Sequence, residues 1–374
     1  MSIVPPAPND ATTVDRVSAL VPWMQHRAAR LDEAGAFPTE ELAALREAGV
    51  LALPLPIGQD LSPQDVRTTA DKLACVLVQA GRGNLSVGRV VEAHVNARHL
   101  IARYGSPRQC ARATEDVRSG HLFALWVTDP PENGLRMSCN LNEIRLDGSK
   151  MFCSAAGYAT RALVTAVDER GEARMLVIEL GTGEHVRPLE SPLQGMRAAV
   201  TGAVDFTRTT IDRDACLGQP GDYLEEPVFS TGAWRSSAVA AGGLQSLIDH
   251  ATTQLKAAGR LDDPHQLQRL GNALVACETS HLWVRQVARI VEDHHADPGH
   301  AIAYTGLARI AVETACLDAM RLVQRSLGLS AFRRGNPVER ICRDLGTYLR
   351  QPAPDEVLTE AAAYVSRQPS GHCT

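Results

Sequence analysis

The spacing of apolar residues changes twice along this 374-residue chain, and that change limits the folds open to it. Residues 13–120 have helical spacing, residues 121–227 alternate with a period of two, and residues 228–374 return to helical spacing. Helical spacing predicts amphipathic helices, and alternation predicts strands with one buried face. We therefore predict an α-helical region, a middle antiparallel β-barrel or sandwich and a helical bundle, after a loose, proline-rich segment at residues 1–12.

Composition narrows the classes of function. A 44% hydrophobic content in a chain of this length allows a sizeable core, and the net charge of −5 argues against a nucleic-acid partner. No apolar run is long enough to span a membrane, and the N-terminus lacks the pattern of a signal peptide. The nine cysteines are scattered without a Cys-x-x-Cys pair, which predicts free thiols and a cytoplasmic location.

A helix is predicted over residues 87–104, because Gly105 follows a run of helical spacing. This segment carries His94 and His99. We interpret them as surface or satisfied core histidines, and the alternative places one of them beside a ligand pocket.

Residues 121–157 combine a short apolar run, a turn-rich segment and a second pair of alternating runs. Ile144 and Leu146 precede Asp147-Gly148, and Lys150 to Cys153 follow, which predicts a β-hairpin with the Asp-Gly pair at its turn. One interpretation is an ordinary pair of strands. The other is a cradle for a flat heteroaromatic ligand, with hydroxyl and backbone groups at its polar edge and an aromatic ring over its face.

The last region has the pattern of a four-helix bundle. Apolar residues recur at helical spacing in two of its helices and predict their core faces: Leu270, Leu274, Cys277, Val284 and Val291 in one, and Leu307, Ile310, Leu317, Met320 and Leu327 in the next. The His- and Asp-rich segment between them, residues 293–300, contains Pro298-Gly299. We predict a helix–helix loop there and no metal site, because the spacing of metal ligands is missing.

The middle region resembles the flavin-contacting part of the acyl-CoA dehydrogenase family. That family has a Thr-Glu-Pro turn, matched by Thr128-Asp129-Pro130, and a Gly-x-Lys-x-aromatic-x-Ser/Thr segment, matched by residues 148–154. Asp129 stands where Glu is usual, and Asn133-Gly134-Leu135 replaces the usual Gly-Ser-Asp. The resemblance implies that Thr128 and Ser154 bond the edge of a flavin and that Phe152 lies near its face.

The resemblance continues through the C-terminal region. Gln324 and Gly328 match a Gln-x-x-x-Gly segment, and Arg260 matches an Arg at the end of an earlier helix. In the family these positions meet the dinucleotide part of FAD, which is bound mainly by a neighbouring subunit. The resemblance therefore implies FAD and a homodimer or homotetramer. Trp234 and Arg235 fall where the family contacts substrate.

A departure from the family concerns the catalytic base. Acyl-CoA dehydrogenation needs a carboxylate within reach of the substrate's α-proton. The two positions that carry this Glu in the family are matched here by Pro352 and Trp234. Asp355 and Glu356 lie just beyond Pro352 and are the candidate bases. The alternative is that Asp355 caps the last helix.

Three functions remain open. The first is an FAD-dependent oxidoreductase that oxidises an acyl thioester or a related small molecule and passes electrons to an acceptor. The second is a flavin-dependent monooxygenase on the same fold, which uses oxygen and needs no α-proton base. The third is a non-catalytic protein that binds flavin or another ligand.

Overall fold

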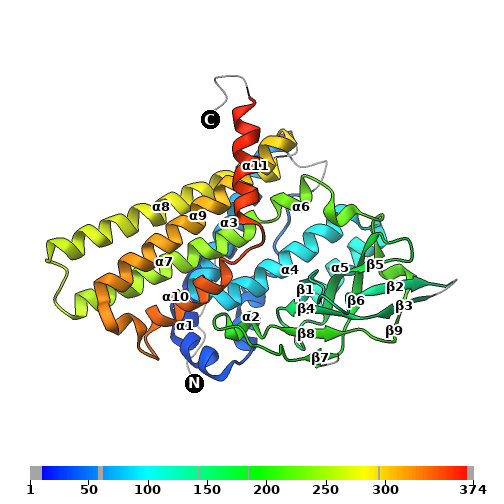
Figure 1. Cartoon of the computed structure of the whole chain (residues 1–374), viewed down its shortest axis with the longest axis horizontal. Coiled ribbons are helices and arrows are strands. Elements are labelled where there is room, and N and C mark those ends of the chain that lie inside the picture. Colours follow the sequence, from blue (N-terminus) through cyan, green and yellow to red (C-terminus); the bar gives the residue numbers. More distant parts are fainter. Residues whose placement is uncertain (1–10, 58–61, 141–142, 184, 294, 369–374) are drawn as a thin grey trace.

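The computed structural model describes residues 11–57, 62–140, 143–183, 185–293 and 295–368. Its elements follow the predicted order, with helices up to residue 118, strands between residues 123 and 217, and helices from residue 228 onward. A long helical bundle lies beside the strand region, and helix α4 runs between the two (Figure 1).

In the described residues of the N-terminal region the helices are α1 (Thr13–Ala34), α2 (Thr39–Glu47), α3 (Pro63–Gly83), α4 (Leu85–Tyr104) and α5 (Pro107–Arg118). Most of the segment predicted to be loose, 1–12, lies outside the described residues, but Thr12 forms a capping box with Asp15 at the start of α1. Ser62 and Asn84 cap α3 and α4, so α4 begins two residues before the predicted helix and ends before Gly105 as predicted.

The strands of the described residues form two sheets. Seven strands make the larger sheet: β1 (Phe123–Trp126), β2 (Arg136–Cys139), β3 (Glu143–Asp147), β5 (Arg161–Val167), β6 (Ala173–Glu179), β9 (Thr209–Asp212) and β10 (Cys216–Leu217). The smaller sheet has β4 (Ser149–Cys153), β7 (Val186–Arg187) and β8 (Gly202–Asp205). The region is not purely antiparallel, because β1 and β2 both pair with β5 in parallel.

The predicted hairpin at Asp147-Gly148 is wrong. β3 pairs with β2 and β9, whereas β4 pairs with β8, so Gly148 joins two different sheets. Gly148 has a φ of +107°, and a Cβ there would lie 2.4 Å from the carbonyl oxygen of Gly134. The Asp-Gly pair therefore marks a sharp change of direction, as its chemistry predicts, but the strands on either side do not pair with each other.

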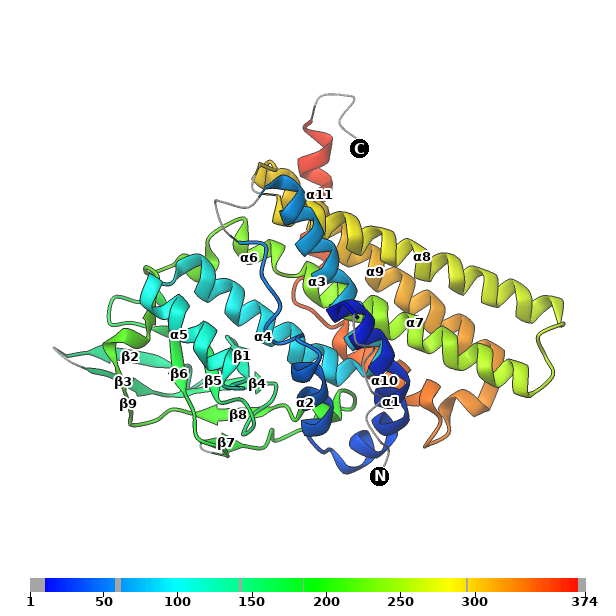
Figure 2. The ribbon, with the colours of Figure 1, turned by 180° about the vertical axis from the view of Figure 1, so that it is seen from behind.

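After the sheets, the described part of the chain forms the helices α6 (Val228–Thr231), α7 (Trp234–Ala257), α8 (Pro264–Glu292), α9 (Pro298–Leu327), α10 (Pro337–Tyr348) and α11 (Pro354–Ser366). The long helices α7, α8 and α9 pack on one another, and α3 from the N-terminal region packs on α7 and α8 (Figure 2). The four-helix bundle therefore consists of α3 from the N-terminal region together with α7, α8 and α9. The predicted boundary at residue 228 separates α3 from the other three helices.

The predicted core faces of α8 and α9 are only partly buried. Cys277 and Val284 are buried on α8 as predicted, but Leu274 and, on α9, Leu317 are exposed. The buried face of α9 consists mainly of small residues, among them Ala308, Ala315 and Ala319. Small side chains allow α9 to approach its neighbours closely, and larger apolar residues such as Met320 and Leu327 pack against the core while only partly buried.

Helices α3 and α7 cross at two glycines. A Cβ on Gly81 would lie 2.2 Å from the carbonyl oxygen of Val239, and a Cβ on Gly242 would lie 2.0 Å from that of Val78. The two backbones are therefore in direct contact, and only glycine fits at either position.

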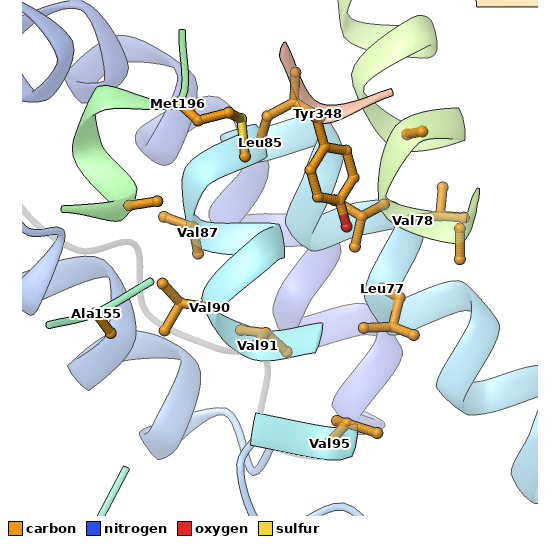
Figure 3. Close-up of a cluster of buried hydrophobic side chains, with 14 of the residues drawn as sticks. Leu77, Val78, Leu85, Val87, Val90, Val91, Val95, Ala155, Met196 and Tyr348 are labelled. Atoms are coloured by element: carbon orange, nitrogen blue, oxygen red, sulfur yellow. The ribbon is translucent and has the colours of Figure 1, made fainter. Parts of the chain in front are cut away.

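The main core lies between α3, α4 and the elements that cover them. Figure 3 shows Leu77 and Val78 of α3 close to Val91 and Val95 of α4, with Tyr348 from the end of α10 entering the same cluster. This packing fixes α4 against the bundle on one side and the sheets on the other. Among the described residues, no helix is both long and apolar enough to cross a membrane.

Candidate functional site

A cavity of about 1130 Å³ lies where the sheets, α4 and the bundle meet. One wall comes from the ends of β1 and β4 and from the segment at residues 193–201, and another comes from α4. The remaining lining residues lie on α6 and just before it, at the start of α7 and the end of α10, in the N-terminal half of α9, and in α11 with the segment before it. A volume of this size is sufficient for a cofactor together with a small substrate.

Three of the predicted residues, Thr128, Phe152 and Ser154, line this cavity together. Ser154 is buried and its carbonyl oxygen accepts the indole N–H of Trp126 (2.9 Å), while Thr128 is exposed and its carbonyl oxygen accepts the N–H of Met151 (2.9 Å). One backbone hydrogen bond and one from the Trp126 side chain therefore hold the segments that carry these three residues side by side.

Lys150 of β4 links this strand to the segment around Thr128. Its ammonium group is fully buried and donates to Asp129 Oδ1 (2.7 Å), Thr165 Oγ1 (3.0 Å) and the carbonyl oxygen of Val127 (3.2 Å). Burial lowers the pKa of Lys150, and the ion pair with Asp129 opposes that shift. Asp129 also accepts the N–H of Leu135 (2.9 Å), so it holds the turn although Glu is usual at this position.

Phe152 has an unusual backbone conformation. Its φ is +54°, a region that aromatic residues rarely adopt, and the register of β4 against β8 shifts between Lys150 and Cys153. The ring is 46% exposed and lies at the cavity. Such strain persists only where the surrounding structure imposes it, and it often occurs at functional sites.

Arg235 and Trp234 begin α7, but Arg235 alone of the two lines the cavity. Arg235 Nη2 and the Trp234 indole N–H both donate to Glu292 Oε1, at 2.9 and 3.2 Å, and Trp234 is fully buried. Burial by itself raises the pKa of Glu292, but Arg235 and His99 outweigh it and bring that pKa down to about 2. Trp234 therefore lies outside the cavity lining and helps to hold the Glu292 carboxylate that pairs with Arg235.

Helix α4 presents a row of polar side chains to the cavity: Arg89, Glu92, Asn96 and His99. Glu92 is 4% exposed, and its two oxygens accept from Arg89 Nη1 and Asn96 Nδ2. Asn96 Oδ1 in turn accepts from Arg235 Nη1 (3.1 Å). The carboxylate of Glu92 therefore has a fixed orientation on the cavity wall, in a network that reaches α7.

The sequence analysis did not predict that these four residues line a cavity, although their spacing in the sequence could have indicated it. The four residues follow one another at steps of three, four and three, which places them on one face of a helix. That face is polar within an otherwise buried helix, which is an informative feature. The alternative that one histidine lies beside a pocket applies to His99, whereas His94 is fully buried away from the cavity lining.

The segment after α10 contains Pro352, which the resemblance matches to the catalytic Glu of the family. Pro352 and Ala353 line the cavity, and the carbonyl oxygen of Pro352 accepts from Arg309 Nη2 of α9 (2.5 Å). Asp355 and Glu356 are exposed in the first turn of α11 and are not part of the cavity lining. Asp355 is also not the helix cap, because Ala353 occupies that position and no side chain caps the helix.

Arg260, Gln324 and Gly328 gather at the far end of the bundle, away from the cavity lining. Arg260 is exposed, and its Nη1 donates to the carbonyl oxygen of Ser326 (3.2 Å), between the other two residues. Gly328 follows the end of α9 with a φ of +60°. Within one chain, these residues therefore form a second group separate from Thr128, Phe152 and Ser154.

Residues 229–360 match the family model described as acyl-CoA dehydrogenase, C-terminal domain. The mitochondrial short-chain specific acyl-CoA dehydrogenase of Bos taurus is 24% identical over 338 residues, which cover 85% of this chain and 80% of the bovine protein.

Solved structures extend the likeness over nearly the whole chain. The dibenzothiophene monooxygenase of Paenibacillus sp. A11-2 superposes with a TM-score of 0.83 at 20% identity, covering 96% of this chain and 98% of that one. A glutaryl-coenzyme A dehydrogenase in complex with glutaryl-CoA superposes with a TM-score of 0.80 at 18% identity, covering 95% of each chain. The chain therefore has the acyl-CoA dehydrogenase fold, with N-terminal helices, a central β-region and a C-terminal helical domain that matches the model of that family.

Proposed function

We propose that this protein is a flavin-dependent oxidoreductase whose reaction takes place in the cavity between α4, the sheets and the bundle. The observation that carries the proposal is that Thr128, Phe152 and Ser154 line the same cavity as the buried carboxylate of Glu92 on α4. Two hydroxyl side chains and an exposed ring suit the polar edge and the face of an isoalloxazine. A bound flavin would supply the two-electron chemistry, as a hydride acceptor or, when reduced, in the activation of oxygen.

The proposed substrate is an acyl thioester or a related small molecule, and Glu92 is the proposed base. A base must lie within hydrogen-bond reach of the proton that it accepts. Glu92 is a buried carboxylate on the cavity wall, and Arg89 and Asn96 fix its orientation. A catalytic role for Asp355 or Glu356 would require the start of α11 to move, so Glu92 is the stronger candidate.

A monooxygenase is the second candidate. Its support is the segment at residues 351–353. At the position where a dehydrogenase would carry its Glu, this segment has Pro352, whose carbonyl oxygen accepts a hydrogen bond from Arg309. A dibenzothiophene monooxygenase with the same fold has also been solved with FMN bound. Oxygen-dependent chemistry would not need Glu92 as a base.

The choice of flavin also belongs to this proposal. We propose FAD, because Arg260, Gln324 and Gly328 gather at a distance from the cavity, where the dinucleotide of a flavin bound by a second subunit would lie. FMN has one phosphate and would not need that group, so the flavin extracted from the purified protein decides this point by its mass.

The test is anaerobic mixing of the purified protein with a panel of acyl-CoA esters while the flavin absorbance is followed. We expect Glu92→Gln to slow bleaching about a hundredfold or more, since loss of a general base typically has an effect of this size. The matched control is the exposed double variant Asp355→Asn, Glu356→Gln, which should bleach at the wild-type rate.

Three other results would contradict parts of the proposal. Loss of bleaching in the control but not in Glu92→Gln would return the catalytic role to α11. Oxygen consumption by the reduced protein without any acyl-CoA bleaching would favour the monooxygenase. Absence of flavin absorbance in the purified and flavin-supplemented protein would leave a non-catalytic binding protein.

A further inference from the structure

The arginines on the cavity wall are paired with carboxylates, with one exception. Arg89 pairs with Glu92, Arg235 pairs with Glu292, and Arg350 pairs with Glu313 at 2.6 Å. Arg309 lines the same cavity, yet no carboxylate within the described part of the chain lies at ion-pair distance from it.

Arg309 forms no direct ion pair with the described residues. Its side chain comes from α9 and is 9% exposed. Nη2 donates to the carbonyl oxygen of Pro352 (2.5 Å), and Nε has no hydrogen-bond partner in the described residues. Burial lowers the pKa of Arg309, and the charge of Glu313, which forms its ion pair with Arg350, opposes that shift.

An unpaired guanidinium is costly to bury, because the protein interior does not replace the water it loses. A ligand that supplies the missing partner would explain why such a group is kept on a cavity wall. A planar guanidinium presents paired N–H groups whose geometry matches a carboxylate or another oxyanion.

The surroundings of Arg309 restrict where such a ligand could lie. Gly306 and Thr305 precede it on the cavity face of α9, and Pro352 covers it from the α10–α11 segment. The Thr305 hydroxyl donates to the carbonyl oxygen of Ala301 (2.7 Å), so its hydrogen is already used. At this end of the cavity Arg350 is paired with Glu313, whereas Arg309 has no ion-pair partner among the described residues and lies beside the position where a dehydrogenase would carry its Glu.

We propose that Arg309 binds an oxyanion, and that this oxyanion is a carboxylate of the substrate. The inference rests on the proposed function only in that it assigns the anion to the substrate of the same cavity. It restricts that substrate to molecules that carry an acidic group apart from the atoms that react. The other source of an oxyanion is the phosphate of the flavin itself.

The test compares small acids with their primary amides by isothermal titration calorimetry of the purified protein. The probes are butanoate, hexanoate, octanoate and benzoate, each paired with its amide, which has nearly the same shape without the charge. We expect at least one acid to bind the wild type more tightly than its amide. The preference should fall roughly ten- to hundredfold in Arg309→Gln, because a charge-assisted hydrogen bond is lost.

Two variants of Arg309 distinguish the loss of its charge from a change in the structure of the cavity. The side chain introduced by Arg309→Gln is neutral but could still donate to the carbonyl oxygen of Pro352, so the wall of the cavity is kept. Arg309→Lys retains the charge and should retain most of the preference for the acid. The affinities of the amides and the thermal unfolding midpoint should be nearly equal in all three proteins.

Each remaining outcome is decisive. The proposal is overturned if no acid binds the wild type more tightly than its amide, or if the preference survives in Arg309→Gln. A loss of flavin from purified Arg309→Gln without any change in the acid preference would assign the oxyanion to the flavin phosphate. None of these results depends on whether the protein turns over acyl-CoA, so failure here is distinguishable from failure of the proposed function.

Discussion

His94 shows how a single buried side chain sets a response to pH. Its Nδ1 accepts the N–H of Phe123 (3.1 Å), so Nε2 carries the hydrogen and lies 2.9 Å from the carbonyl oxygen of Leu51. Complete burial, with Arg98 nearby, lowers the pKa of His94 to about 3. Protonation would place a second N–H against that of Phe123, so the folded protein resists it.

The sign of the pH effect follows from this lowered pKa. Above pH 6.5 His94 is neutral in both the folded and the unfolded chain, and its contribution to stability is complete. As the pH falls from 6.5 towards 3, only the unfolded chain gains a proton, and the free energy of unfolding decreases by up to about 1.4 kcal/mol per pH unit.

We therefore predict that the free energy of unfolding falls between pH 7 and pH 5 by about 2 kcal/mol more in the wild type than in His94→Gln. Gln can make both hydrogen bonds and does not titrate. The measurement is urea unfolding followed by circular dichroism at the two pH values. The control is His26→Gln, at an exposed position of α1, which should keep the wild-type pH dependence. Equal slopes in wild type and His94→Gln would contradict the assignment.

At the scale of elements, the crossing of α3 and α7 determines how the N-terminal region joins the bundle. We predict that Gly242→Ala lowers the free energy of unfolding by about 1–3 kcal/mol or more, because the new Cβ would meet the carbonyl oxygen of Val78 at 2.0 Å. The matched control is Gly271→Ala on α8, which has no heavy atom within 4 Å of the added Cβ and should stabilise by about 0.5–1 kcal/mol.

Chemical denaturation of the two variants checks this prediction directly. A Gly242→Ala protein as stable as the wild type would show that the two helices separate readily. Since Arg235 begins α7 and α4 continues from α3, we also expect Gly242→Ala to disturb the cavity. Weaker flavin retention in that variant, without a change in Gly271→Ala, would support the link.

At the scale of the whole molecule, the outer side of the bundle carries apolar residues that the chain itself does not cover. Leu267, Leu274 and Leu282 of α8 are exposed, and so are Leu329 and Phe332 just after α9. Exposed apolar surface of this kind is typical of protein–protein contacts. It supports the predicted homodimer or homotetramer and lies partly beside Gly328, one of the residues predicted to meet the dinucleotide of a partner's flavin.

We predict that the double variant Leu274→Glu, Leu282→Glu shifts the protein towards the monomer and reduces its flavin content. Size-exclusion chromatography with light scattering measures the first, and the ratio of absorbance at the flavin band to that of the protein measures the second. Leu224→Glu, at an exposed leucine shortly after β10, is the control and should leave both unchanged. Retention of the wild-type mass by the double variant would place the subunit contact elsewhere.

The sequence determined the features that depend on near neighbours in the chain. The period of the apolar residues predicted where helices and strands occur, and the caps and glycines set the bounds of α3 and α4. The resemblance at residues 148–154 and at the turn of Thr128 implied that Thr128, Phe152 and Ser154 lie together at a flavin; the three residues do line one cavity, and their contact with a flavin stays a prediction. The predictions of helices, strands and helix ends rest on local spacing, which the chain carries whatever its tertiary contacts, whereas the prediction of the three cavity residues rests on the family resemblance.

Tertiary structure alone decided which distant segments meet. The Asp-Gly pair fixed a turn at Gly148, but the competition among strands for partners sent β3 and β4 into different sheets. Glu92 and Arg309 are far apart in the sequence and share a cavity only because α4 and α9 pack around it. Asp355 was a plausible base by its position in the chain, yet the direction of α11 leaves it exposed. The direction of a helix such as α11 depends on long-range packing, so it cannot be predicted from local spacing in the sequence.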